Sequence, residues 1–437
     1  MTINFPLSLI KALSSSLTWV FVDKFFRLML VLISEVLLAR YLGPEYFGIY
    51  SYVIAIYAIF FVIASFGIDN NLVKDLVHTP DERHALITSA GLIKFFGGIF
   101  AFFISTLWAY YFSHDQLLLI ALVSIGYLFQ WTKVFELYYQ SENNFRLVAL
   151  SASLMGLCFF IIKLTLIFQG ASLISFCVVY ILELICVGLT VCMIYVRHQN
   201  MSIQLDLSVI RRHLKMSWPL VLSGIAVIVY LKIDQVMLQQ LAGSSVLGVY
   251  AAAIKLSEGW YFIGGIITTV MAPKVYRLQQ SNQTDYDNFL KKMIAYLILL
   301  AGVIVILISI SSDILLNFLY GGSYQGASSI LNVHIWALFF AYLGCVQGIY
   351  WIAEGLQKVF LYQNLCSALL NIGLNLLLIP SYQGVGAAWA TVIAYGLPVL
   401  MVPYVVKRAS HLHQIHLGAL CMIPSILRLK NNQNGHG

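Results

Sequence analysis

Long apolar runs separated by short polar connections dominate the chain. A helix needs about 20 mostly apolar residues to cross a hydrocarbon core about 30 Å thick. By this measure the sequence predicts twelve transmembrane helices. They cover residues 12–39, 46–67, 86–111, 117–139, 146–168, 172–196, 216–239, 246–271, 290–319, 326–353, 359–379 and 385–406. The first run carries charged residues and ends in LARYLGP instead of a small-residue cleavage site, so we expect it to remain as the first span.

Composition and charge strengthen this interpretation. Of the 437 residues, 60% are hydrophobic and only 10% are charged, whereas a soluble protein carries about 25% charged residues. Seventeen of the 25 lysines and arginines lie at the termini, in alternate connections or at the adjoining span ends, seven lie deeper within spans, and only Arg40 lies in the opposite connections. The positive-inside rule therefore predicts cytoplasmic termini. We expect the basic connections to face lipid headgroups and not nucleic acid.

Two stretches repeat each other at an offset of 200 residues. Residues 35–51 (EVLLARYLGPEYFGIYS) align without gaps on residues 235–251 (QVMLQQLAGSSVLGVYA). The identical pairs are Val36/Val236, Leu38/Leu238, Gly43/Gly243, Gly48/Gly248 and Tyr50/Tyr250. A second match, at an offset of 212, pairs Tyr138/Tyr350, Glu142/Glu354 and Arg146/Lys358. These matches favour a duplicated unit of six spans, although turn chemistry alone can produce matching glycines. Six spans per unit give both copies the same orientation.

The predicted fold is therefore an all-α polytopic membrane protein with two parallel six-helix lobes around a central cavity. Parallel repeats of this kind build transporters that rock two bundles around a shared site. The predicted parts are an N-lobe (1–196), a cytoplasmic linker (197–215), a C-lobe (216–406) and a basic cytoplasmic tail (407–437).

Charged residues inside the spans are the candidate functional residues, because each costs about 3 kcal/mol at the bilayer centre. Lys24, Arg27 and Glu35 share one stripe of the first span, with Asp23 at its edge. The other candidates are Glu183 in the sixth span, Asp234 near the outer end of the seventh, and Lys255 and Glu258 in the middle of the eighth. Such groups must face a water-filled cavity or one another.

Guanidinium and ammonium groups suit a phosphate-bearing ligand. We therefore predict that Lys24, Arg27 and Lys255 bind a diphosphate. We expect the carboxylates Asp23, Glu35, Glu183, Asp234 and Glu258 to keep the empty cavity near neutral and to carry a coupling ion. The competing interpretation is that Arg27 and Lys255 only form salt bridges between helices.

Other charged residues need no functional role. Lys133 and Glu136 are spaced to pair on one helix, and Lys94 is placed to extend toward the cytoplasmic interface. Lys163 lies near the outer end of its span.

The sequence gives little support to an enzymatic or metal-binding function. The seven cysteines form no zinc-type spacing, and no nucleophile–base constellation is visible. A membrane polysaccharide polymerase or ligase would need a long periplasmic loop, but connections such as 112–116 and 169–171 are very short. The HLHQIH run at 411–416 precedes an apolar, basic stretch, so we expect an interfacial helix there and no metal site.

Three stretches carry a resemblance to a known family: ARYLGPEYFGIYSY (39–52), IASFGIDNNLVKDL (63–76) and IPSYQGVGAAWATVIAYG (379–396). The chain resembles Wzx-type polysaccharide flippases of the multidrug/oligosaccharidyl-lipid/polysaccharide (MOP) exporter superfamily. The resemblance implies a non-enzymatic carrier in the bacterial inner membrane. It would flip an undecaprenyl-pyrophosphate-linked oligosaccharide from the cytoplasmic to the periplasmic leaflet by alternating access, for O-antigen, capsule or exopolysaccharide biosynthesis.

The resemblance further implies proton or sodium coupling without an organic cofactor, and other polysaccharide assembly proteins as partners. A cation-coupled multidrug antiporter of the same superfamily is the main alternative. A site for cationic drugs should be dominated by carboxylates and aromatic rings. Within their stated bounds the spans here hold ten basic and seven acidic residues, which favours an anionic ligand.

Overall fold

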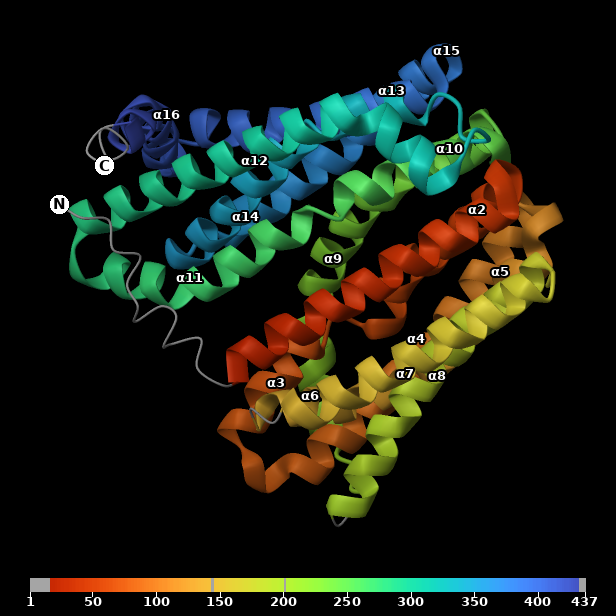
Figure 1. Ribbon diagram of the computed structural model, residues 1–437. Helices are drawn as coiled ribbons and strands as arrows, with labels where there is room; N and C mark the ends of the chain where they lie inside the picture. The colour runs from red at the N-terminus through yellow and green to blue at the C-terminus, as the bar shows by residue number, and fades with distance from the viewer. Residues whose placement is uncertain (1–15, 143–144, 200–201, 432–437) are drawn as a thin grey trace. The chain divides into compact units, whose positions relative to one another are not determined.

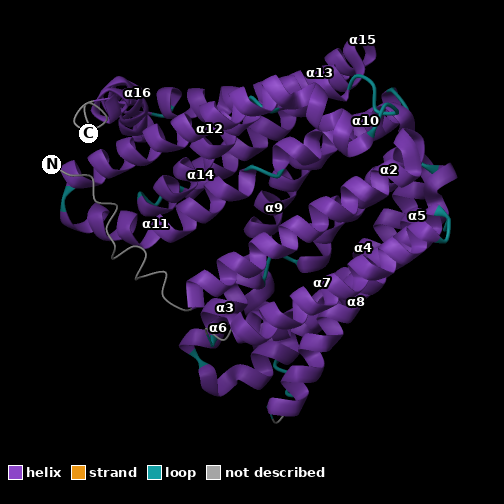
Figure 2. Ribbon diagram, viewed as in Figure 1, coloured by secondary structure: helices purple, strands orange, loops and turns teal. Residues whose placement is uncertain are grey.

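The computed structural model describes residues 16–142, 145–199 and 202–431, and every regular element in these ranges is helical (Figures 1 and 2). Within the helices, the side chains at 16–24, 70, 80, 145–147, 218–220, 223, 408 and 426–431 are not described. Asp23 and Lys24 therefore lie outside the described side chains. The all-α class that the apolar runs predict is confirmed for the described part of the chain.

The helices follow one another with short connections. In chain order they are α2 (Ser16–Ser65), α3 (Asp69–His78), η1 (Pro80–Glu82), α4 (Arg83–Phe112), η2 (His114–Gln116), α5 (Leu117–Ser124), η3 (Ile125–Thr132), α6 (Lys133–Ser141), α7 (Phe145–Phe168), α8 (Leu173–His198), α9 (Leu207–Leu241), α10 (Ser244–Glu258), α11 (Tyr261–Ser281), α12 (Gln283–Tyr320), α13 (Ala327–His334), α14 (Ala337–Ala353), α15 (Gln357–Val405), η4 (Lys407–Ala409) and α16 (Ser410–Asn431).

The chain divides into two compact units. The first contains the residues up to Leu42 together with Ile49–Ile228, and the second contains Gly43–Gly48 and the residues from Val229 onward. The division falls inside α9, which continues from one unit into the other. The described residues of the expected 197–215 linker are non-helical only at Gln199 and 202–206. The other described residues of this segment belong to the ends of α8 and α9, and the bounds of the linker remain a prediction.

Nine helical segments of the described chain are long and apolar enough to cross a membrane. Two of them, Phe25–Ser65 and Gln357–Val405, each cover a pair of predicted spans. At 1.5 Å per residue, a straight helix of either length would be roughly twice as long as the bilayer core is thick. Each contains a non-helical residue, Gly43 (φ 73°) or Gln383 (φ 49°), where the sequence predicts a boundary between spans. The total of twelve spans remains a prediction.

The predicted eighth span is not one continuous helix. Helix α10 ends at Glu258 and α11 begins at Tyr261, so the chain is interrupted at Gly259–Trp260. This pair of helices is not among the nine candidate spans. Lys255 and Glu258 therefore occupy the last turn of a helix and not the middle of one. A helix C-terminus carries partial negative charge that favours a cation such as Lys255.

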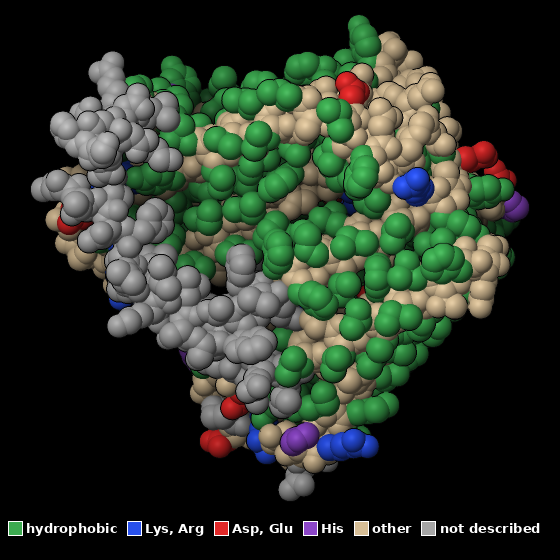
Figure 3. Space-filling model, viewed as in Figure 1, with side chains coloured by type: hydrophobic (Ala, Val, Ile, Leu, Met, Phe, Trp, Pro, Cys, Tyr) green, Lys and Arg blue, Asp and Glu red, His purple; other side chains and the backbone are tan. Residues whose placement is uncertain are grey.

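Apolar stripes on single helices are exposed to the surroundings. On α4, Phe96, Phe100, Phe103 and Leu107 are 55–64% exposed, and on α12, Val303, Leu307, Ile310 and Ile314 are 56–78% exposed. Each set follows the spacing of one helix face. Hydrophobic side chains also far outnumber charged ones on the face drawn in Figure 3. Apolar surface on this scale fits contact with lipid and not with water.

Within the second unit, Gly48 and Gly248 each pack against the residue four positions before the other glycine. A Cβ atom added to Gly48 would lie 1.8 Å from the carbonyl oxygen of Ser244, and one added to Gly248 would lie 1.8 Å from that of Pro44. Positions 44 and 244, like 48 and 248, are separated by 200 residues. The contact is therefore reciprocal in the register of the predicted duplication, and it requires glycine on both sides.

Candidate functional site

A pocket of about 290 Å³ lies within the first unit. Its walls come from α2, from the η3–α6 stretch, from α7 and from α8. Five charged side chains line it: Arg27, Lys133, Glu136, Lys163 and Glu183. Apolar residues, including Phe61, Phe129 and Phe160, complete the wall. The pocket thus combines three cations and two carboxylates with an apolar lining inside a bundle of candidate spans.

An irregular stretch in the predicted fourth span forms one wall of this pocket. Helix α5 gives way at Ile125 to η3, a 3₁₀ helix of eight residues. Runs of 3₁₀ helix longer than about four residues are uncommon, and inside a longer helix they often mark functional positions. Close packing adds to the local shape, since a Cβ atom on Gly188 of α8 would lie 2.2 Å from the Thr132 hydroxyl oxygen. The predicted tenth span, which is the fourth span of the predicted second unit, is also interrupted, between His334 and Ala337.

Two ion pairs organise the charges of the pocket. Lys163 Nζ of α7 lies 2.7 Å from Glu183 Oε2 of α8, and these side chains are 15% and 23% exposed. Lys133 Nζ lies 2.6 Å from Glu136 Oε2, with side chains 37% and 40% exposed. The expected Lys133–Glu136 pair is confirmed. Glu183, which has no partner on its own helix, finds one on α7, and that partner is a lysine to which the sequence analysis gave no function.

Two tyrosines lie between Glu35 and Glu183, which are predicted site carboxylates of the first unit. Tyr50 and Tyr180 each interact electrostatically with both Glu35 and Glu183. The Tyr180 ring contacts Tyr50 edge-on at 6.5 Å between centroids. The structure therefore brings Glu35 close to the surroundings of Glu183, and Glu183 lines the same pocket as Arg27.

The remaining predicted site residues belong to the second unit. The Asp234 carboxylate is buried and accepts hydrogen bonds from the Tyr250 hydroxyl and from the Gln235 backbone N–H. Glu258 Oε2 lies 3.4 Å from Lys232 Nζ. Lys255 is half-buried in α10. Because Lys255 belongs to the other unit and Lys24 is outside the described side chains, their convergence with Arg27 remains a prediction.

A polar stripe inside the second unit is not among the residues predicted from the sequence. Gln363, Ser367, Asn371 and Asn375 follow one another at four-residue intervals on α15, and each is at most 5% exposed. Asn375 donates a hydrogen bond to Asn371, and Gln363 donates one to Gln347 of α14. The four-residue spacing of amides and a hydroxyl within the 359–379 span is the signal that could have identified this stripe.

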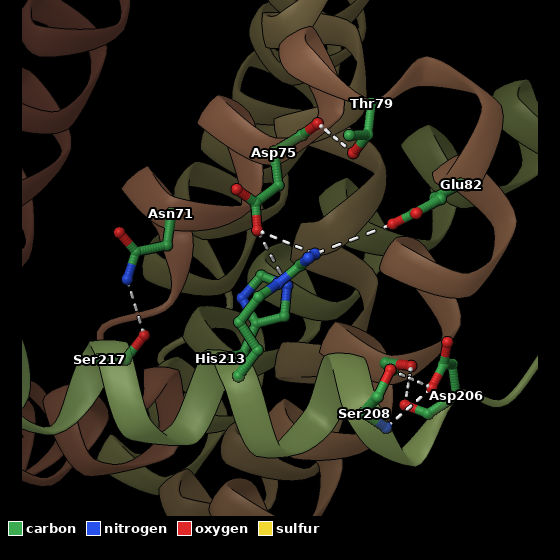
Figure 4. A network of polar contacts seen from close by, with 10 residues as sticks. Asn71, Asp75, Thr79, Glu82, Asp206, Ser208, His213 and Ser217 are labelled. Atoms are coloured by element: carbon green, nitrogen blue, oxygen red, sulfur yellow. Dashed lines mark hydrogen bonds and ion pairs between the residues drawn. The ribbon is translucent and has the colours of Figure 1, made fainter.

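A second polar network lies outside the nine candidate spans, between α3 and the beginning of α9 (Figure 4). Asp75 Oδ2 lies 3.4 Å from an Arg212 nitrogen and 3.7 Å from His213 Nε2. Asn71 donates a hydrogen bond to the Ser217 hydroxyl. Burial lowers the pKa of His213, an effect that Asp75 opposes and Arg212 reinforces. These contacts attach α3 to the helix that continues into the second unit.

Helix α3 is also attached to α4. Lys94 is completely buried, and its Nζ lies 2.5 Å from Asp69 Oδ1 in the first turn of α3. The expectation that Lys94 extends to the interface is therefore wrong. The lysine instead neutralises a carboxylate beside an apolar core formed by α3, α4, α6, α8 and α9.

The HLHQIH run forms part of α16 and is divided among several contacts. His411 Nε2 lies 2.9 Å from Asp287 Oδ1 of α12, and the His413 ring contacts Tyr404. His416 is buried. In the described residues, no group of three or more His, Cys, Asp or Glu side chains is arranged to hold a metal ion.

Comparison with known structures identifies the class of fold. A structure described as the lipid II flippase MurJ, in an inward closed conformation, superposes with a TM-score of 0.71 at 19% identity, over 93% of this chain and 92% of that one. An inward-facing MATE-family multidrug resistance transporter of the MOP superfamily gives a TM-score of 0.72 at 12% identity, over 92% and 96%. The protein is therefore a multi-pass membrane protein with the MurJ/MATE fold.

Sequence comparison identifies the family. Residues 14–279 match the polysaccharide biosynthesis protein family, so the chain belongs to that family. The chain is also 24% identical over 384 residues to the capsular polysaccharide biosynthesis protein CapF of Staphylococcus aureus, covering 84% of this chain and 92% of that protein.

Proposed function

We propose that this protein is a Wzx-type flippase of polysaccharide biosynthesis. It carries an undecaprenyl-pyrophosphate-linked oligosaccharide from the cytoplasmic to the periplasmic leaflet of the bacterial inner membrane. Twelve spans, in two lobes of the same orientation, alternate access to a central cavity, and both termini are cytoplasmic. Membership of the polysaccharide biosynthesis family supports this proposal, and so does the fold shared with a structure described as a lipid II flippase.

The observation that carries the proposal is the charged pocket of the first unit. It presents Arg27, Lys133 and Lys163 against two carboxylates, with apolar walls beside them. Guanidinium and ammonium groups bind phosphate oxygens through charge-assisted hydrogen bonds. In the proposed mechanism Arg27 holds the diphosphate together with Lys24 and Lys255, while the lipid tail stays in the bilayer. Other polysaccharide assembly proteins supply and remove the glycan.

The energy source in this proposal is a proton or sodium gradient. The candidate ion carriers are Glu35 and Glu183 in the first unit and Asp234 and Glu258 in the second, with Asp23 on the first span. A buried carboxylate costs free energy unless it is paired or neutralised, which links its charge state to the occupancy of its surroundings.

Replacing the basic residues tests the substrate assignment. Arg27→Ala, and separately Lys255→Ala, should abolish surface polysaccharide while leaving the protein in the membrane. Lys74→Ala is the matched control, because Lys74 is an exposed cation of α3. Surface glycan is measured by immunoblotting and the protein by membrane fractionation. Normal glycan output from both test variants would refute the roles assigned to Arg27 and Lys255.

A multidrug antiporter is the second candidate, and one observation favours it. Glu35 and Glu183 lie among Tyr50 and Tyr180, and carboxylates with aromatic rings suit organic cations. Cells lacking the protein should then become sensitive to cationic drugs while retaining their surface glycan. The flippase proposal requires the opposite phenotype.

A further inference from the structure

We propose that Lys163 is a second anion-binding residue of the pocket and that Glu183 is its ion-pair partner until the ligand binds. In this exchange a ligand phosphate takes over Lys163, and Glu183 takes up a proton. The inference rests on the proposed function, because it concerns the same pocket and the same diphosphate-bearing ligand.

The geometry of the Lys163–Glu183 pair is what suggests an exchange. The two side chains come from different helices, α7 and α8, and meet at 2.7 Å in the wall of the pocket that Arg27 also lines. Both are more than three-quarters buried. Removing one partner of such a pair leaves an uncompensated charge in a poorly solvated place, which is strongly unfavourable. When a ligand displaces Glu183 from Lys163, the negative charge of the Glu183 carboxylate must therefore be neutralised.

Uptake of a proton neutralises the displaced Glu183 carboxylate. When a phosphate oxygen of the ligand replaces Glu183 Oε2 at Lys163 Nζ, the hydrogen bond to Glu183 breaks and the bond to the phosphate forms. The released carboxylate then takes one proton from water and becomes a neutral carboxylic acid. Without that proton, two negative groups would stand side by side in a low-dielectric pocket, which is unfavourable. One proton enters the site with each diphosphate, so in this exchange Glu183 neutralises the loaded site and another of the candidate carboxylates carries the driving ion; no other reactant is needed.

Several charged and titratable groups surround the exchange. Arg27 of α2 lines the same pocket, as do Lys133 and Glu136 of α6. Tyr50 of α2 and Tyr180 of α8 interact with both Glu35 and Glu183. With three cations and two carboxylates the pocket lining carries a net charge of +1, and protonation of Glu183 raises it to +2. The site therefore becomes more attractive to an anion at the moment when the anion binds.

The chain contains a matched control in the same pocket. Lys133 and Glu136 make an equally short ion pair at 2.6 Å, but within one helix and with side chains 37% and 40% exposed. Exposed pairs of this kind contribute little and their charges remain hydrated when separated. Loss of the Glu136 charge should therefore leave the proton linkage of the ligand in place.

Isothermal titration calorimetry measures the number of protons that the protein takes up when the ligand binds. The full-length protein is reconstituted in nanodiscs of zwitterionic phosphatidylcholine and titrated with farnesyl diphosphate as the probe. Titrations in buffers of different ionisation enthalpy give the number of protons taken up. We expect about one proton per diphosphate in the wild type, and affinity that falls with rising pH by at most about tenfold per pH unit, the limit for one linked proton.

Single substitutions test the roles of Glu183 and Lys163 separately. Glu183→Gln should bind without proton uptake and independently of pH, because its Lys163 is already available. Lys163→Met should lose about tenfold in affinity, as expected for one charge-assisted hydrogen bond, and should lose the proton uptake as well. Lys163→Arg should restore binding, which guards against a folding defect. Glu136→Gln should still take up about one proton.

The outcomes distinguish this inference from the proposed function. Proton uptake that persists in Glu183→Gln, or wild-type affinity in Lys163→Met, overturns the exchange. Binding by the wild type without any proton uptake also overturns it, while leaving the diphosphate pocket intact. Absence of diphosphate binding at every pH, in the wild type as well as the variants, would instead reject the assigned ligand, and the exchange with it.

Discussion

Gly48 occupies a position where no other residue fits. The nearest atoms to an added Cβ are backbone atoms of Ser244, the oxygen at 1.8 Å and the carbonyl carbon at 2.7 Å. A flexible side chain can move aside, but a backbone carbonyl can do so only if its helix moves. Gly48→Ala should therefore lower stability by at least the roughly 1–3 kcal/mol typical of overpacking. The measurement is thermal unfolding in detergent.

Gly265 provides the control for this substitution. It lies inside α11, and beyond its chain neighbours and the adjacent backbone of that helix no heavy atom lies within 4 Å of its added Cβ. Gly265→Ala should leave the unfolding temperature unchanged or raise it, because alanine favours a helix by about 1 kcal/mol relative to glycine. If Gly48→Ala unfolded at the same temperature as Gly265→Ala, the close contact with Ser244 would be wrong.

Asp75 is the residue through which α3 holds the beginning of α9. Its carboxylate faces both Arg212 and the buried His213. Asp75→Asn removes the charge but keeps the shape, so the loss should be about 1 kcal/mol, the typical size of a half-exposed interaction. We expect faster hydrogen exchange in residues 69–78, measured by mass spectrometry. Glu82→Gln is the control, because Glu82 is 53% exposed and lies 3.9 Å from Arg212, and it should leave this exchange unchanged.

Packing of α16 should depend on pH through His416. Burial, reinforced by His413, lowers the pKa of His416 to about 4, against about 6.5 when the residue is exposed. The undocked helix therefore binds more protons between these values, so docking is fully stable above about pH 6.5 and weakens as the pH falls toward 4. The difference corresponds to about 3 kcal/mol.

Protease sensitivity of α16 measures this effect. Cleavage within residues 410–425 should accelerate as the pH is lowered from about 7 to about 4.5, assayed with an acid-tolerant protease. His416→Leu, which cannot be protonated, should suppress the acceleration. A variant that became sensitive at the same pH as the wild type would show that another group controls the docking, for example the His411–Asp287 pair.

The helices themselves are the feature that the sequence predicts best. Apolar run length locates α4, α7 and α8 within a few residues, and the boundaries between apolar runs locate the breaks at Gly43 and Gln383. Irregularities inside an apolar run escape this reasoning. The 3₁₀ stretch η3 and the interruption after Glu258 leave hydropathy unchanged, because they depend on packing between helices and not on composition.

The sequence does not predict which charged residues on different helices form ion pairs in the site. Periodicity finds neighbours on one helix, such as Lys133 and Glu136, because their spacing is fixed by helix geometry. Lys163 and Glu183 are 20 residues apart on two helices, and Asp69 reaches Lys94 across 25 residues. Such pairs depend on how helices pack, so sequence analysis names the charged residues of the pocket without finding which of them meet.

The side of the membrane on which the chain ends depends on how many times the chain crosses. The predicted eighth span is the crossing to test, because the segment formed by α10 and α11 is not among the nine candidate spans of the described chain. If this pair did not cross, the count would become odd and the C-terminus periplasmic. Lysine and arginine placement favours the even count, because 17 of 25 lie on the side of the termini and only Arg40 on the other.

Reporter fusions to the full-length chain decide between the two counts. Green fluorescent protein at the C-terminus should fluoresce, and alkaline phosphatase there should be inactive, because the C-terminus is cytoplasmic. Alkaline phosphatase inserted at residues 169–171, between α7 and α8, should be active and serves as the control for a periplasmic connection. Active phosphatase at the C-terminus would mean that α10 and α11 do not cross. The two repeats would then contain unequal numbers of spans, and the parallel duplication could not hold.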